Sequence, residues 1–109
     1  MKIFYNNKKL EKQCTNLKIA KKEYGDKIGR KLFKAINFIQ EAPNLSLIIN
    51  FRSYHFHNLK GDRSGQYAID IGSRRDGYRL VMEFNEEDVF RDAIYIEDIY
   101  LVEMGKHYE

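Results

Sequence analysis

The spacing of apolar and polar residues divides the chain into a helical first part and a β-rich second part. An apolar, aromatic start over residues 1–6 predicts an opening strand. Apolar side chains then recur every three or four residues, which predicts a helix over about residues 8–24. Gly25 supplies a stop, and Asp26 a cap for a second helix whose apolar face extends over residues 28–39. We expect these two helices to form a hairpin.

Beyond Pro43 the pattern loses its helical period. An apolar, irregular stretch over residues 45–51 is expected to pack across the helices. Alternation of apolar and polar residues then predicts antiparallel strands over residues 54–59, 66–71 and 78–84, and a last strand somewhere within residues 94–104. Turns that contain glycine join the first three of these strands.

The strands over residues 66–71 and 78–84 each have one apolar face. Every second residue in them is apolar, whereas Arg79 falls on the other face. Helices packed against the apolar face would bury both apolar surfaces. We therefore expect an α+β fold, with an N-terminal strand and a two-helix hairpin packed on one face of an antiparallel sheet. The other face stays open and carries Arg79.

Length and composition are those of one small globular domain. With 109 residues and a single weak boundary signal, we expect one domain over residues 1–109. The chain is 43% apolar and has eight Tyr and seven Phe, which is enough for a core without a disulfide. Its lone Cys14 has no internal partner, no apolar run approaches the ~20 residues of a membrane span, and the start does not resemble a secretion signal. These features predict a cytoplasmic protein that is not attached to a membrane.

Charge is distributed unevenly along the chain. Residues 1–40 contain eleven Lys and Arg against three Asp and Glu, whereas residues 86–103 contain seven acidic residues and one Arg. This asymmetry predicts two surfaces of opposite charge. The lysine-rich helices could contact ribosomal RNA phosphates, bind an acidic segment of a partner, or serve only to keep the helices soluble. Charge alone does not choose among these roles.

A segment around the first predicted turn carries residues suited to RNA cleavage. It contains His55, His57, Lys60 and Arg63. Cleavage of RNA needs a base for the 2′-hydroxyl proton, cations for the phosphate and an acid for the departing 5′-oxygen. Histidine can exchange protons near neutral pH and arginine can bind phosphate through two donors. Surface strand ends also carry such residues, so the cluster alone leaves both interpretations open.

Two runs of this sequence resemble the HigB-type toxins of the RelE superfamily. Residues 57–70, HNLKGDRSGQYAID, and residues 78–84, YRLVMEF, are similar to the His-x-Leu-Lys-Gly and aromatic-Arg-Leu patterns of that family. The ending over residues 102–108 is similar to the family's closing segment, which also carries a His and a Tyr. The resemblance covers essentially the whole chain, including the two helices.

The resemblance implies a RelE-like toxin of a type II toxin-antitoxin system. Such a toxin enters the ribosomal A site and cuts messenger RNA through attack by the RNA's own 2′-hydroxyl, without a metal or another cofactor. Its partners would be a helix-turn-helix antitoxin of the HigA kind and the ribosome with its messenger. Two alternatives remain, a ParE-like inhibitor of DNA gyrase and an inactive toxin retained as a binding and repression module.

The resemblance also assigns roles to individual residues. His57 and Lys60 match the catalytic His and Lys, and Arg79 matches the phosphate-binding Arg. His107 and Tyr108 fall on the C-terminal catalytic pair, in the reverse of the order found in many members. Arg79 and Lys60 are expected to hold the scissile phosphate, His57 or His107 to take the proton, and Tyr108 to stack on the base. Further RNA contacts are expected at Arg63, Arg74 and Arg75.

Overall fold

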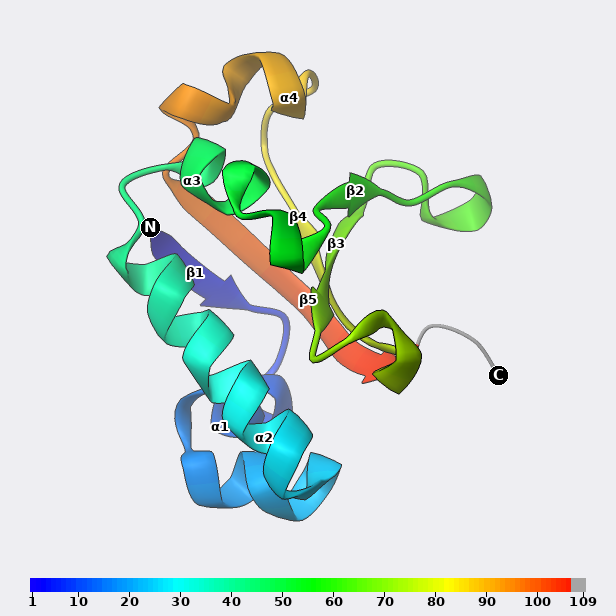
Figure 1. Ribbon diagram of the computed structural model, residues 1–109. Coiled ribbons are helices and arrows are strands. Elements are labelled where there is room, and N and C mark those ends of the chain that lie inside the picture. Colours follow the sequence, from blue (N-terminus) through cyan, green and yellow to red (C-terminus); the bar gives the residue numbers. More distant parts are fainter. Residues whose placement is uncertain (107–109) are drawn as a thin grey trace.

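The structure, a computed structural model, describes residues 1–106 (Figure 1). Its strands are β1 (Lys2–Tyr5), β2 (His57–Asn58), β3 (Tyr67–Ile71), β4 (Tyr78–Glu83) and β5 (Asp98–Lys106). Its helices are α1 (Lys8–Thr15), α2 (Leu17–Glu41), α3 (Leu45–Asn50) and α4 (Val89–Asp92). Four short 3₁₀ turns complete this part of the chain, η1 (Arg52–Tyr54), η2 (Gly61–Arg63), η3 (Arg74–Asp76) and η4 (Ala93–Tyr95).

The five strands form one sheet in the order β1-β5-β4-β3-β2. Neighbouring strands are antiparallel except for β1 and β5, which run parallel from Lys2 opposite Asp98 to Tyr5 opposite Leu101. The predicted α+β architecture is confirmed, but the sheet is mixed rather than wholly antiparallel. An apolar strand pattern contains no information about direction, so the parallel pairing was not predictable from residues 1–6.

The N-terminal helices bend at two places rather than one. Gly25 leaves the helical conformation with φ +88°, as predicted. The chain also breaks between α1 and α2, where the Asn16 side chain accepts a hydrogen bond from the backbone N–H of Ile19 at 3.1 Å. The prediction of one helix over residues 8–24 was wrong here, because the apolar spacing continues through the cap. No helix within residues 1–106 is both long and apolar enough to cross a membrane.

The two arms of α2, before and after Gly25, are in backbone contact. A β-carbon placed on Gly29 would lie 2.6 Å from both the Cα and the backbone nitrogen of Lys21. Real side chains do not approach backbone atoms so closely, so glycine is required at this position.

One apolar core lies between α2 and the sheet. Leu32, Ile36 and Ile39 of α2 are buried with Ile69 of β3 and Leu80 of β4. The alternation predicted for β3 and β4 is therefore confirmed. The helices cover one face of the sheet, and the opposite face is open.

Three other segments differ from the predictions. Residues 45–50 form helix α3 instead of an irregular stretch, with the Asn44 side chain accepting from the backbone N–H of Ser46 at 2.9 Å. The strand predicted over residues 54–59 is reduced to β2, because η1 and a left-handed residue precede it. β5 starts at Asp98 and runs to Lys106, beyond the predicted end, with a bulge where its register against β4 shifts.

Candidate functional site

The open face of the sheet carries the candidate site. Strand register places one row of residues, His57, Ala68, Val81 and Glu103, across this face, and a second row, Asp70, Arg79 and Gly105, beside it. Ala68 and Val81 are buried together with Leu59 and form a small apolar floor. Arg79 lies at the side of this floor, on the face that alternation predicted.

The imidazole of His57 is oriented by a hydrogen bond to the backbone. Its Nδ1 lies 2.7 Å from the backbone carbonyl oxygen of His55. A carbonyl oxygen can only accept a hydrogen bond, so Nδ1 donates, and in the neutral ring the lone pair is on Nε2. The two imidazole rings also stack, with centroids 4.6 Å apart and 24° between their planes. His57 therefore presents a proton acceptor from a fixed ring.

His55 is fixed by an acid that sequence reasoning missed. It has φ +48°, the one positive φ of a non-glycine residue within residues 1–106. Its Nδ1 lies 3.5 Å from an Asp70 carboxylate oxygen, and its Nε2 lies 3.2 Å from an Arg74 guanidinium nitrogen. The Asp70 residue is only 9% exposed. Backbone strain of this kind is frequent at functional sites, and here it positions the carbonyl that orients His57.

Arg79 is available to an anion. The residue is half-buried, and its guanidinium makes no hydrogen bond or ion pair with another of residues 1–106. Strand spacing places the Cα atoms of His57 and Arg79 about 12 Å apart on the same face. The imidazole of His57 and the longer side chain of Arg79 can both reach a nucleotide bound between them. A guanidinium can hold two oxygens of its phosphate.

Lys60 lies just beyond the end of β2. It follows Leu59, whose side chain belongs to the apolar floor, and its own backbone is extended. Lys60 makes no hydrogen bond or ion pair through its side chain with another of residues 1–106. The residue is exposed at the start of η2.

The three arginines predicted to contact RNA differ in their surroundings. Arg63 donates to Glu103 and to Gln66, each at 2.7 Å, so its guanidinium is already bound. Arg74 contacts His55 and lines a hollow of about 480 Å³ with Asp70. Arg75 is exposed on η3 and forms no ion pair within the described part of the chain.

His107 and Tyr108 lie outside the described residues. Lys106, where β5 ends, pairs with Tyr78 beside Arg79, and its Nζ lies 5.3 Å from the centre of the Tyr78 ring. In residues 1–106 no three His, Cys, Asp or Glu side chains are grouped closely enough to hold a metal ion.

Comparison with solved structures identifies the architecture. The chain superimposes on a YoeB/ParE toxin from Agrobacterium tumefaciens with a TM-score of 0.57, covering 99% of this chain and 100% of that one, at 14% sequence identity. The chain has the fold of RelE/ParE-type toxins. No protein-family model matches the sequence, and no curated protein matches it either. At this identity the likeness establishes the predicted RelE-like fold, and an argument about chemistry has to start from the side chains of the open face.

The turn that leads from β3 to β4 is fixed by Asp76. Its carboxylate accepts from the backbone N–H of Ser73 at 2.8 Å and pairs with Lys27 at 3.1 Å. These contacts, the Ser73 backbone hydrogen bond above all, lower the pKa of Asp76 to about 2 from an ordinary value of 3.8. A lowered pKa in the folded state means that the contribution to stability is complete above the ordinary pKa and is lost as the pH falls toward 2.

We therefore expect Asp76→Asn to weaken the dependence of the thermal unfolding temperature on pH between about pH 4 and pH 2. Unfolding followed by circular dichroism across this range measures the slope. The control is Asp62→Asn, which removes an exposed carboxylate with no hydrogen bond to another of residues 1–106. Equal slopes for the wild type and Asp76→Asn would contradict the assigned contacts.

Proposed function

We propose that this protein is a HigB-type toxin of a type II toxin-antitoxin system, an endoribonuclease that cuts messenger RNA in the ribosomal A site. The observation that carries the proposal is the hydrogen bond that orients His57, with its Nε2 on the same open face as the Arg79 guanidinium, neither of which has a hydrogen-bond partner among residues 1–106. The RelE/ParE-type fold supports it. The residue pattern around His57 and Arg79 supports the narrower HigB assignment.

The proposed reaction is transfer of the phosphoryl group to the neighbouring 2′-oxygen. His57 Nε2 takes the 2′-hydroxyl proton, the 2′-oxygen attacks phosphorus, and the bond from phosphorus to the 5′-oxygen breaks. The products are a 2′,3′-cyclic phosphate and a 5′-hydroxyl, which needs one proton from an acid. Arg79 stabilises the charge on the phosphate oxygens. His107 is the proposed acid, and Tyr108 the proposed stacking partner of the base.

Lys60 has a different place in this proposal from Arg79. Its exposed ammonium adds positive charge where the RNA would leave the open face near η2. The exposed guanidinium of Arg75 is the second proposed contact with RNA phosphates. Arg63 and Arg74, which are held by the protein's own side chains, would act chiefly by maintaining the shape of the site.

The proposal includes partners and a compartment. A helix-turn-helix antitoxin of the HigA kind would neutralise the protein, and the ribosome with its messenger would be the target, both in the cytoplasm. A ParE-like inhibitor of DNA gyrase is the second candidate, because the similar solved structure is described as a YoeB/ParE toxin. Such an inhibitor would not require a proton acceptor opposite a phosphate-binding arginine.

Assays of ribosome-bound messenger cleavage and of gyrase supercoiling separate these functions. We expect the wild type to cut messenger and His57→Ala to cut it roughly 10²- to 10⁴-fold more slowly, because the general base is lost. Asn37→Ala, an exposed and uncharged substitution on α2 away from the open face, is the control. Inhibited supercoiling with intact messenger would favour the gyrase inhibitor. Neither activity, combined with antitoxin-dependent DNA binding, would favour the repression module.

A further inference from the structure

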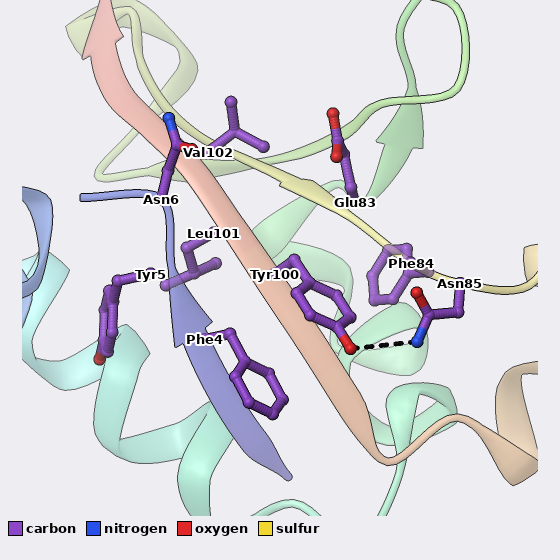
Figure 2. A pocket seen from close by; sticks show the side chains of 9 residues that line it. All are labelled: Phe4, Tyr5, Asn6, Glu83, Phe84, Asn85, Tyr100, Leu101 and Val102. Carbon is purple, nitrogen blue, oxygen red and sulfur yellow. Dashed lines mark hydrogen bonds between the residues drawn. The ribbon is translucent and has the colours of Figure 1, made fainter.

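A second hollow, of about 330 Å³, lies on the open face between β1, β5 and the end of β4 (Figure 2). Phe4 and Tyr100, which are register partners, stack with ring centroids 4.8 Å apart and 13° between their planes. Lys2 Nζ lies 5.2 Å from the centre of the Phe4 ring. Aromatic rings combined with a nearby cation are the elements with which proteins bind single-stranded nucleic acid.

The hollow also offers hydrogen-bond acceptors. Glu83 lines it and accepts a hydrogen bond from Gln66 Nε2 at 2.8 Å through one carboxylate oxygen, which leaves the other oxygen without a partner among residues 1–106. Asn85 donates through Nδ2 to the Tyr100 hydroxyl at 3.0 Å, the dashed contact in Figure 2, so its amide oxygen remains an acceptor. Carboxylate and amide oxygens accept from the exocyclic amino groups of cytosine, adenine and guanine. Uracil has a carbonyl oxygen where cytosine has its exocyclic amino group.

The hollow is on the same face of the sheet as His57 and Arg79, but at a distance from them. Glu83 lies four residues after Arg79 on β4, so both side chains are on the same face of the sheet and their Cα atoms are about 13 Å apart. A base in the hollow therefore belongs to a neighbouring nucleotide rather than to the one whose phosphate Arg79 would hold. Tyr100 is the register partner of Glu83, so a planar base beside the Tyr100 ring would lie next to the carboxylate.

We propose that this hollow is a specificity subsite for the RNA substrate, in which a base with an exocyclic amino group stacks on Tyr100 and donates to Glu83. The inference rests on the proposed function and adds to it the class of base that the site prefers. Phe4 extends the stack on the far side of Tyr100, and Lys2 supplies positive charge for the adjoining phosphate. The flat ring stack favours a nucleobase over a peptide side chain.

Binding of uncleavable RNA tests the subsite independently of catalysis. The probes are two 2′-O-methyl trinucleotides that differ only in a central cytosine or uracil. We expect the wild type to bind the cytosine probe about tenfold more tightly, the discrimination typical of one well-made contact to a base edge. Glu83→Gln should remove this preference, because a glutamine amide can donate to uracil as well as accept from cytosine. Glu87→Gln, which makes the same charge change at an exposed position outside the hollow, should preserve it.

Substitution of Tyr100 tests the stacking. Tyr100→Leu should weaken binding of both probes about tenfold through loss of the aromatic face. Tyr100→Phe keeps the ring and loses only the contact with Asn85, so its affinities should remain close to those of the wild type. Thermal unfolding of both variants shows whether any loss of affinity reflects loss of fold.

Equal affinity of the wild type for the two probes would overturn the inference. It would also be overturned if folded Tyr100→Leu bound both probes normally. Loss of antitoxin binding by that variant, with normal binding of both probes, would likewise overturn it. Cleavage of ribosome-bound messengers with cytosine or uracil beside the cut is the second measurement. A cytosine preference in binding without any cleavage would remove the proposed nuclease function and leave the base subsite. Cleavage without any preference in binding would remove the base subsite and leave the proposed nuclease function.

Discussion

Replacing Arg79 with alanine is expected to lower the rate of messenger cleavage by about 10²- to 10³-fold, the usual cost of removing one group that stabilises developing charge. The guanidinium lies on the open face and forms no ion pair within residues 1–106, so its removal leaves no buried acid without a partner. The thermal unfolding temperature should therefore stay close to that of the wild type. Single-turnover cleavage on programmed ribosomes measures the rate.

Arg79→Lys is the matched variant for this experiment. It keeps the charge but loses the two-donor geometry, so its rate should fall between those of the wild type and Arg79→Ala. Lys60→Ala is also expected to reduce cleavage, with folding intact. Unchanged cleavage by both alanine variants would remove the phosphate-binding assignment. Growth arrest that persisted with Arg79→Ala would argue against the nuclease in cells.

The second large effect is expected for stability, at Gly29. A methyl group there would lie 2.6 Å from backbone atoms of Lys21, and backbone cannot move aside as a flexible side chain can. We expect Gly29→Ala to lower the free energy of unfolding by about 3 kcal/mol, the upper part of the range for overpacking. Urea unfolding measures the change. Gly105→Ala is the control, since its new β-carbon would meet nothing within 4 Å.

A stable Gly29→Ala protein would mean that the two arms of α2 do not touch in solution. Loss of cleavage without loss of stability at Gly29 would also contradict this explanation, because the residue lies in α2, on the covered side of the sheet.

Strand alternation predicted the part of the site that depends on β4. Arg79 falls between apolar residues that face the core, and this period alone places it on the open face. The same reasoning could not predict the short β2. His55 takes a left-handed conformation that delays the start of the strand, and local sequence gives little warning when the residue is not glycine.

The acid behind His55 was missed for a different reason. Asp70 shares its face with Ala68, so alternation alone gave it an exposed position. Only the folded chain shows that η1 and η3 meet over it and bury it beside His55 and Arg74. Its one available signal was register, because Asp70 lies opposite Arg79 in the hairpin of β3 and β4. Contacts of this kind depend on loop conformation, which the periodicity of a sequence does not encode.

The parallel pairing of β1 with β5 affects when the open face can form. β1 has no strand to pair with until β5, its one partner in the described sheet, has been synthesised. Contacts between the two ends of a chain form late, because closing such a long loop is entropically costly. β5 also supplies Gly105, the neighbour of Arg79. We therefore expect the nascent chain to emerge without a complete open face, so that the proposed activity would be absent until β5 has paired with β1 and β4.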